Sequence, residues 1–256
     1  MQTENPYSAP DSALNGSELL NEVSSRYPFR PADALAKGVY IAVGVHILGL
    51  LATTAVTIYE RNILGQVQSG AAALEAVRLS LLAGDRWLVL ANALQMLALL
   101  VCYVIGGMWI YRAACNVRSL GARGLDDSPG WAVGWYAVPF ANLAMPFRAM
   151  KQIRLASESP HGWRSRNTPV LLTTWWTLFL INGLGGYAVA RLGAEKTVAA
   201  LAIMQTWLIV YHVFSILAAV SFIKVVSEVT GLQASTHANP PSAPAALSDN
   251  PLFANP

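Results

Sequence analysis

The sequence predicts an all-α integral membrane protein with four transmembrane helices and a proline-broken, re-entrant or interfacial helical segment. Charged residues make up only 12% of the 256 residues, and the mean hydropathy of +0.42 is high for a soluble protein. Three prolines interrupt one apolar stretch, and four other apolar runs contain no Asp, Glu, Lys or Arg. These runs are Gly38–Ile58, Leu88–Ile110, Thr168–Ala190 and Thr197–Ile223.

Each of the four runs is long enough to cross a hydrocarbon core of about 30 Å at about 1.5 Å per residue. None carries the polar stripe of a soluble amphipathic helix. Residues 1–32 and the Pro/Ala-rich residues 231–256 are predicted to be disordered tails around a helical transmembrane domain, residues 33–230. Residues 1–30 lack the basic-then-apolar start of a signal peptide, so we expect the first run to serve as the insertion signal.

The connections between the runs follow in order. We expect the first span to end near Ile58, and residues 62–86 to form a loop that contains an amphipathic helix. The second run has aromatic residues at both ends, as interfacial anchors do, and the third begins at a proline suited to a first helical turn. The link Arg191–Lys196 is so short that the third and fourth runs must be antiparallel neighbours.

The stretch from 129 to 147 cannot form one straight helix, because it contains Pro129, Pro139 and Pro146. Proline lacks the backbone N–H and clashes with the carbonyl four residues earlier. Ser128-Pro129 is a favourable helix start, with a capping hydroxyl and a proline in the first turn. At membrane depth, a broken backbone is tolerated only where it is buried in protein or faces a wet cavity.

The distribution of Lys and Arg indicates which way this stretch runs. If it crossed the membrane, the cytoplasmic side would hold 8 of the 17 cations and the other side 9. If it returned to the same face, the cytoplasmic side would hold 12 and the other side 5. Cytoplasmic loops carry an excess of Lys and Arg. The sequence therefore favours four spans with both termini in the cytoplasm.

Polar and aromatic residues in and beside this stretch form the candidate ligand- or lipid-binding site. Two tryptophans one helical turn apart share a face, an amide lies between two prolines, and two arginines flank the segment. The alternative is structural: tryptophans as interfacial belts, amides as backbone partners and arginines that obey the positive-inside rule. The candidate residues are Arg112, Asn116, Trp131, Trp135, Asn142 and Arg148.

Other kinds of chemistry have little support in the sequence. No catalytic motif is present, so we assign no catalytic residue, no metal ligand and no cofactor. Cys102 and Cys115 do not make a metal motif, and the net charge of +3 gives no reason to expect nucleic acid. Polar side chains within the runs, such as His46 and His212, are expected to form interhelical hydrogen bonds. A proton relay or metal pair of these two histidines is the alternative.

A motif of fixed order runs from Trp109 to Arg148. It reads W-x-Y-R-x-x-x-N, then S-P-G-W-A-V-G-W, then V-P-x-A-N-L-x-x-P-x-R. This order resembles a family of uncharacterised bacterial membrane proteins that is classed as a domain of unknown function. The resemblance covers about residues 40–225. It implies a multi-pass protein of the bacterial cytoplasmic (inner) membrane, and it implies no activity.

We therefore expect a non-enzymatic scaffold, regulator or lipid-responsive interaction module. Its expected partners are membrane lipids and, through the cytoplasmic tails, other proteins. A passive channel or facilitator for a small solute is the alternative, because the runs carry no ionisable group except His. A weaker alternative is a membrane enzyme that acts on lipids through Arg112, Asn142 and Arg148.

Overall fold

Four long helices run antiparallel along the computed structural model, which describes residues 26–192 and 197–241. Helices α2 (Asp33–Gln68) and α3 (Leu74–Ser119) have 36 and 46 residues, so they are about 54 and 69 Å long at about 1.5 Å per residue. A short turn joins them, and Gly70 adopts φ 74° there. Both lengths exceed the thickness of a bilayer core, about 30 Å.

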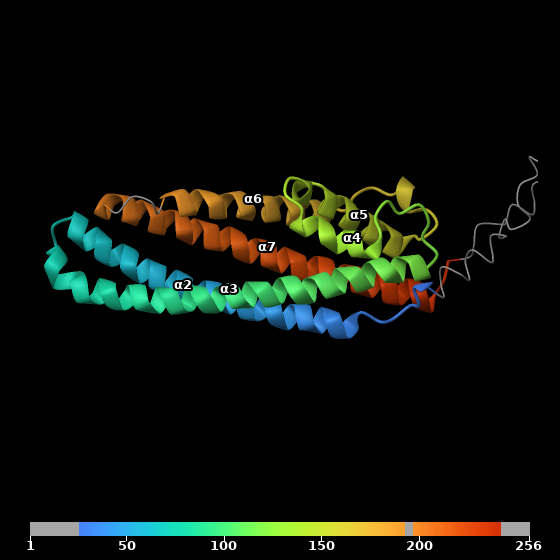
Figure 1. Cartoon of the computed structure of the whole chain (residues 1–256), viewed down its shortest axis with the longest axis horizontal. Coiled ribbons are helices and arrows are strands. Elements are labelled where there is room, and N and C mark those ends of the chain that lie inside the picture. Colours follow the sequence, from blue (N-terminus) through green and yellow to red (C-terminus); the bar gives the residue numbers. More distant parts are fainter. Residues whose placement is uncertain (1–25, 193–196, 242–256) are drawn as a thin grey trace, which may run out of the picture.

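Helices α6 (Val170–Leu192) and α7 (Val198–Ala238) form the second long pair. Helix α7 packs against both α2 and α6, and α2 also packs against α3. Figure 1 accordingly shows α7 running between α6 and the α2–α3 pair. The predicted antiparallel pairing of the third and fourth runs is confirmed, and no strand occurs in the described part of the chain.

Three helices are long and apolar enough to cross a membrane: α2, the Arg86–Ser119 part of α3, and α7. The chain is therefore all-helical with apolar helices typical of a multi-pass membrane protein. The run expected over Thr168–Ala190 forms α6, which is not among these three helices. Helix α6 contains two tryptophans, Asn182 and several glycines, which lower its mean hydropathy.

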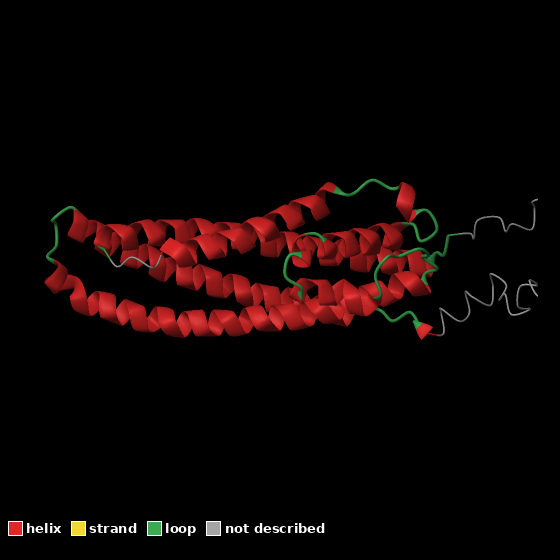
Figure 2. Ribbon diagram, turned by 45° about the horizontal axis from the view of Figure 1, so that its top comes forward, coloured by secondary structure: helices red, strands yellow, loops and turns green. Residues whose placement is uncertain are grey.

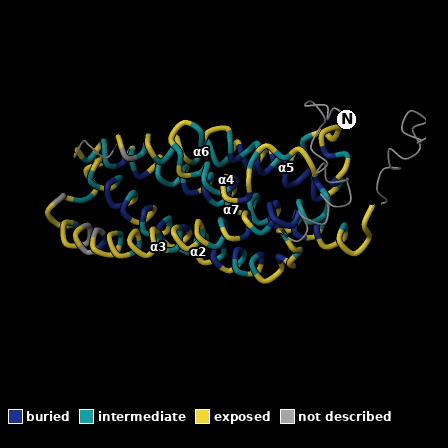
Figure 3. Tube along the Cα trace, turned by 45° about the vertical axis from the view of Figure 1, so that its right-hand side comes forward, coloured by how far each residue is buried: buried dark blue, intermediate teal, exposed yellow. Residues whose placement is uncertain are grey.

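The long helices present apolar side chains outward. Leu94, Leu97 and Leu100 of α3 are exposed, as are Ile41 and Leu48 of α2. In Figure 3 exposed residues follow the outer turns of α2 and α3, whereas buried residues lie where these helices face the rest of the bundle. Such extensive apolar exposure is typical of a lipid-facing surface rather than a water-facing one.

Polar side chains in the apolar runs pair between helices, as predicted. Gln95 Nε2 lies 2.6 Å from His46 Nδ1, and Thr54 Oγ1 lies 2.8 Å from His212 Nδ1. Ser215 donates a 2.7 Å hydrogen bond to Asn182 Oδ1. These contacts join α2 to α3, α2 to α7 and α6 to α7. The two histidines therefore have separate partners, and neither hydrogen-bonds the other.

The first helix continues past the predicted end at Ile58, and Glu60 is consequently inside the bundle. Glu60 is only 3% exposed, and Gln205 of α7 donates a 2.7 Å hydrogen bond to the Glu60 carboxylate. Gly84 of α3 leaves room for this carboxylate, because a Cβ there would lie 2.5 Å from Glu60 Oε1. The expected loop over residues 62–86 is instead the continuation of α2, a turn and the start of α3.

Both ends of the described chain lie at the same end of the bundle (Figure 1). The Phe29 ring stacks on His237 with centroids 3.8 Å apart, and the backbone of Arg30 hydrogen-bonds the Asn116 side chain. Helix α7 continues to Ala238, past the expected boundary at residue 230. The remainder of the two predicted tails lies outside the described residues.

At this end a helical hairpin packs beside the long helices. It comprises α4 (Pro129–Gly134), the short 3-10 helices η1 (Trp135–Ala137) and η2 (Ala141–Leu143), and α5 (Met145–Glu158). Helix α5 contacts α3 and α7. Figure 2 shows that the hairpin reaches along part of the bundle and returns, and that a loop with η3 (Trp163–Ser165) leads on to α6.

Candidate functional site

The hairpin begins as the local sequence predicts. Trp131 N donates a 3.3 Å hydrogen bond to Ser128 Oγ, and Pro129 occupies the first turn of α4. The hydroxyl thus satisfies a backbone donor that a helix start leaves without an internal partner. The predicted helix start at Ser128-Pro129 is confirmed.

The chain reverses direction at Pro139 and Phe140. Phe140 adopts φ 62°, and it is the single non-glycine residue with positive φ in the described chain. Ala141 N donates to Pro139 O over 2.7 Å, and Asn142 N donates to Val138 O over 2.9 Å. Pro146 stands in the first turn of α5, where a missing N–H does no harm. Pro146 therefore starts a helix, whereas Pro139 marks the break.

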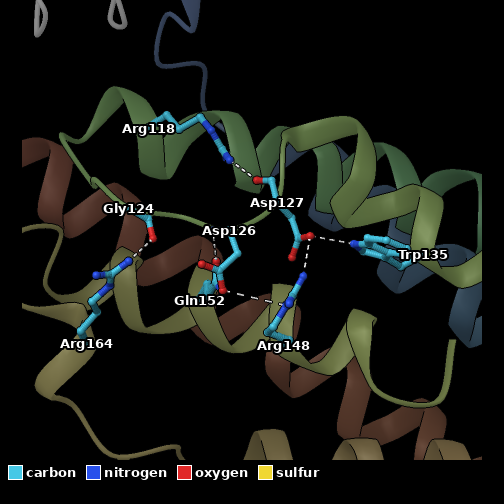
Figure 4. A network of polar contacts seen from close by, with 8 residues as sticks. All are labelled: Arg118, Gly124, Asp126, Asp127, Trp135, Arg148, Gln152 and Arg164. Atoms are coloured by element: carbon cyan, nitrogen blue, oxygen red, sulfur yellow. Dashed lines mark hydrogen bonds and ion pairs between the residues drawn. The ribbon is translucent and has the colours of Figure 1, made fainter. Parts of the chain in front are cut away.

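Asp127 is the centre of the polar network that closes the hairpin (Figure 4). Its Oδ1 accepts two hydrogen bonds of 2.8 Å, from Trp135 Nε1 and from Arg148 Nη2. Its side chain is 6% exposed, and Arg118 at the end of α3 donates to its backbone carbonyl. One residue thus joins α3, η1 and α5. A buried carboxylate is stabilised only if it is paired and hydrogen-bonded in this way.

Asp126 and Gln152 hold the same junction by reciprocal hydrogen bonds. Asp126 N donates to Gln152 Oε1 over 3.0 Å, and Gln152 Nε2 donates to Asp126 Oδ2 over 2.6 Å. Arg148 Nε lies 4.0 Å from the same Asp126 oxygen. Residues 126–127 contact residues 148–152. The segment between them therefore starts and ends at the same position along the bundle.

The hairpin packs beside the apolar parts of the long helices. A Cβ on Gly107 of α3 would lie 3.3 Å from Val133 of α4. The Phe147 ring lies 6.0 Å from Trp176, and the Tyr136 ring 6.2 Å from Phe179. The partners on α3 and α6 belong to the runs Leu88–Ile110 and Thr168–Ala190. The hairpin therefore lies alongside segments with the hydropathy of membrane spans.

Three of the six predicted site residues come together here. The rings of Trp131 and Trp135 lie 4.6 Å apart, and Arg148 shares Asp127 with Trp135. Asn142 lies in η2 on the returning limb, and its side chain hydrogen-bonds no described residue. Arg112 is half-buried on α3 and makes no ion pair within the described ranges. No hydrogen bond or ion pair joins the side chains of Arg112, Asn142 and Arg148 to one another in the described part of the chain.

Asn116 has a separate place in the fold. Its amide nitrogen donates to Arg30 O over 2.9 Å and to Gln233 Oε1 over 3.0 Å, and its oxygen accepts from Arg30 N over 3.2 Å. Gln233 in turn donates to Ala113 O and to Ser157 Oγ, each over 3.0 Å. This buried network joins the N-terminal segment to α3, α5 and α7, and it occupies the Asn116 amide fully.

Sequence reasoning missed Asp126, Asp127 and Gln152. The positive-inside rule counts cations, so it gave these acids no weight, although they are adjacent and directly precede the helix start at Ser128. An acidic pair followed about twenty residues later by Arg148 was the available signal for a hairpin that closes on itself. Among the described residues, no three His, Cys, Asp or Glu side chains come together as a metal site.

The comparisons with known proteins agree with the resemblance seen in the sequence. The model of the family described as "Domain of unknown function (DUF4328)" matches residues 72–231, which include α3, the hairpin, α6 and most of α7 but not α2. No curated protein and no solved structure matches the chain. Because the match spans well over half of the 256 residues, the chain belongs to the DUF4328 family.

Proposed function

We propose that this protein is a non-enzymatic protein of the bacterial inner membrane that acts as a lipid-responsive interaction module. It spans the membrane four times, with α6 as the third span and both termini in the cytoplasm. The hairpin of residues 128–148 is its membrane-contacting element. It enters the cytoplasmic leaflet beside α3 and α6 and does not cross.

The antiparallel course of α2, α3, α6 and α7 supports four spans, because an even number returns the chain to its starting side. The stacking of Phe29 on His237 agrees with termini on one side. The placement of 12 of the 17 cations at that end supports a cytoplasmic location.

The observation that carries the proposal is the exposed tip of the hairpin. Phe140 is 88% exposed, and its positive φ is unfavourable for a bulky residue. Trp131 and Leu143 are also exposed. Strained residues persist where the surrounding structure holds them, and they are frequent at functional sites. Here Asp127 and Gln152 hold both limbs of the hairpin, so its apolar edge (Trp131, Phe140 and Leu143) stays presented to the bilayer.

The geometry favours neither alternative function. A channel would need polar side chains along a water-filled path, but His46, His212 and Asn182 are hydrogen-bonded between helices. A lipid enzyme would need its functional groups to converge, but no hydrogen bond or ion pair within the described residues links Arg112, Asn142 and Arg148. An interaction module needs only a surface that its fold holds in place.

Thiol accessibility tests the membrane contact. Phe140→Cys is made in a background in which Cys102 and Cys115, both free thiols, are alanine. We expect a membrane-impermeant maleimide to spare this thiol in inverted inner-membrane vesicles and to label it after detergent is added. Arg166→Cys, at an exposed position on the α5–α6 loop, is the control that should react in both. Equal labelling of the two thiols in vesicles would refute membrane contact by the tip.

The composition of lipids that co-purify with the protein tests the function itself. Phe140→Ser and Leu143→Ser should alter the retained lipids, as measured by mass spectrometry, while the melting temperature in detergent stays the same. Leu94→Ser removes an exposed leucine of α3 away from the hairpin and should leave the lipid profile unchanged. Identical profiles in all three variants and the parent would contradict a lipid-responsive hairpin.

A further inference from the structure

Two loops at the hairpin end of the bundle border a solvent-open cavity of about 350 Å3. One loop, residues 120–128, connects α3 to α4, and the other, residues 159–169, connects α5 to α6. The lining includes Arg123, His161, Trp163, Arg164 and Ser165. The cavity lies outside the hairpin, so a ligand could bind there whether or not the hairpin contacts the membrane.

Cross-loop hydrogen bonds hold the cavity together. Trp163 is buried, and its Nε1 donates to Arg123 O over 2.9 Å. Arg164 Nη2 donates to Gly124 O over 2.7 Å (Figure 4), and its guanidinium carbon lies 5.2 Å from the centre of the Trp163 ring. The two loops are about forty residues apart in sequence, so the basic side chains converge only through these contacts.

Two glycines allow the basic side chains to approach the 120–128 loop. Gly121 and Gly124 have φ values of 91° and 66°, which side chains rarely tolerate. A Cβ at Gly121 would lie 3.1 Å from His161 Cε1, and one at Gly124 would lie 2.6 Å from Arg164 Nη2. The positive φ values favour glycine at both positions, and the absence of a Cβ leaves room for His161 and Arg164 to lie close to this loop.

The cavity carries positive charge that no carboxylate in its lining offsets. The acids nearest in sequence are bound elsewhere, because Asp126 accepts from Gln152 and Glu158 pairs with Arg154 and Arg166. Within the described residues, the Arg123 guanidinium has no hydrogen-bond acceptor, and Arg164 uses a single donor nitrogen. Most of the guanidinium donors in the cavity are therefore available to a ligand.

We propose that this cavity binds a phosphate monoester group, either free in solution or as the headgroup of phosphatidic acid. Guanidinium groups match the geometry of phosphate oxygens and bind them through paired hydrogen bonds. A phosphate monoester carries a charge of about −1.5 to −2 at pH 7, which two arginines balance. His161 adds a further donor, and Trp163 forms an apolar wall.

Binding is measured with the full-length protein in detergent, titrated with inorganic phosphate in calorimetry at constant ionic strength. Arg123→Gln is the most informative variant, because it removes a charge and keeps the backbone carbonyl that Trp163 binds. We expect Arg123→Gln and Arg164→Gln each to weaken phosphate binding about tenfold or more, as loss of a hydrogen bond to a charged group does. Arg166→Gln removes the same charge from the same loop but not from the cavity lining, and it should bind phosphate normally.

A second arm distinguishes the source of the phosphate. The same variants in lipid nanodiscs are compared for retention of phosphatidic acid, a monoester, and phosphatidylglycerol, a diester. Binding of phosphatidic acid but not inorganic phosphate identifies a lipid ligand, and the reverse identifies a soluble one. In either case the loss must follow Arg123→Gln and Arg164→Gln. The proposal is overturned if neither probe binds, or if Arg166→Gln weakens binding as much as the cavity variants do.

Discussion

At the scale of single residues, Asp127 holds the hairpin to the bundle. Its carboxylate is buried and binds Trp135 and Arg148 through one oxygen, while its backbone carbonyl accepts from Arg118. Arg148, which the sequence predicts as a ligand-binding cation, lies against both Asp126 and Asp127. The Asp127 side chain is buried, whereas that of Arg148 is half-exposed, so removing Arg148 would leave the buried Asp127 charge without its ionic partner.

Asp127→Asn tests this role, since asparagine keeps the size and an oxygen acceptor but loses the charge. We expect a loss of about 1–3 kcal/mol in the free energy of unfolding, which is typical of a broken bond to a charged group. Unfolding in detergent by denaturant provides the measurement. Glu75→Gln is the matched control: Glu75 pairs with Arg78 in an exposed position, so the loss there should be about 0–1 kcal/mol. Equal losses in the two variants would mean that Asp127 does not hold the hairpin.

Phe140 is the second informative residue, because its φ of 62° is costly for any residue except glycine. Phe140→Gly and Phe140→Ala both remove the ring, so their difference isolates the backbone strain. We expect the glycine variant to be about 1 kcal/mol more stable than the alanine variant, since such strain costs about 1–3 kcal/mol and glycine loses about 0.5–1 kcal/mol of chain entropy. Equal stabilities in the same denaturant assay would show that the tip is not strained.

At the scale of elements, an ion network on α5 fastens it to α7. Arg154 donates to Glu228 of α7 over 2.8 Å and to Glu158, one turn along α5, over 2.6 Å. Ser157 accepts from Gln233 of α7. These contacts connect α5 to the protruding end of α7, beyond its apolar run. Helix α5 therefore anchors the hairpin to α7.

The pH dependence of stability tests this network. The hydrogen bond from Arg154 lowers the pKa of Glu158 below its ordinary value of 4.5. A lowered carboxyl pKa stabilises the fold above the unfolded-state pKa, and this contribution disappears as the pH falls through the folded-state value. We expect the melting temperature of the parent in detergent to fall below about pH 4.5 more steeply than that of Glu158→Gln. Parallel pH profiles would exclude a contribution from Glu158.

At the scale of the whole molecule, long antiparallel helices bring both described ends of the chain to the hairpin end. The same end of the bundle carries the Asn116–Gln233 network and the cavity lined by Arg123 and Arg164. Apolar side chains along α2 and α3 remain exposed. The bundle thus combines an apolar outer surface with polar groups that pair in its interior, which is the arrangement expected of a membrane protein.

Topology reporters test this arrangement. A reporter fused after Leu120 and another fused after Ser157 should report the same cytoplasmic side, because the intervening hairpin closes on itself through Asp126–Gln152 and Asp127–Arg148. A fusion after Gln68, at the far end of α2, should report the opposite side and serves as the control. Opposite sides for Leu120 and Ser157 would mean that the hairpin segment crosses the membrane.

The sequence by itself determined the helical class, the apolar runs, the helix start at Ser128-Pro129 and the pairing of Trp131 with Trp135. Each of these depends on neighbouring residues, through hydropathy, capping or helical spacing, and such local signals can be read without a fold. The membership of an uncharacterised family was likewise visible in the motif from Trp109 to Arg148.

Only the tertiary structure decided which polar groups meet. Asp127 hydrogen-bonds Arg148, Asn116 hydrogen-bonds Arg30 and Gln233, and the buried Glu60 hydrogen-bonds Gln205. These partners are 21 to 145 residues apart in sequence, so no local pattern specifies them. A buried charge or amide must be satisfied, but several partners in the chain could satisfy it equally well. The packing of the long helices selects among these partners. At the base of the hairpin it pairs Arg148 with Asp127.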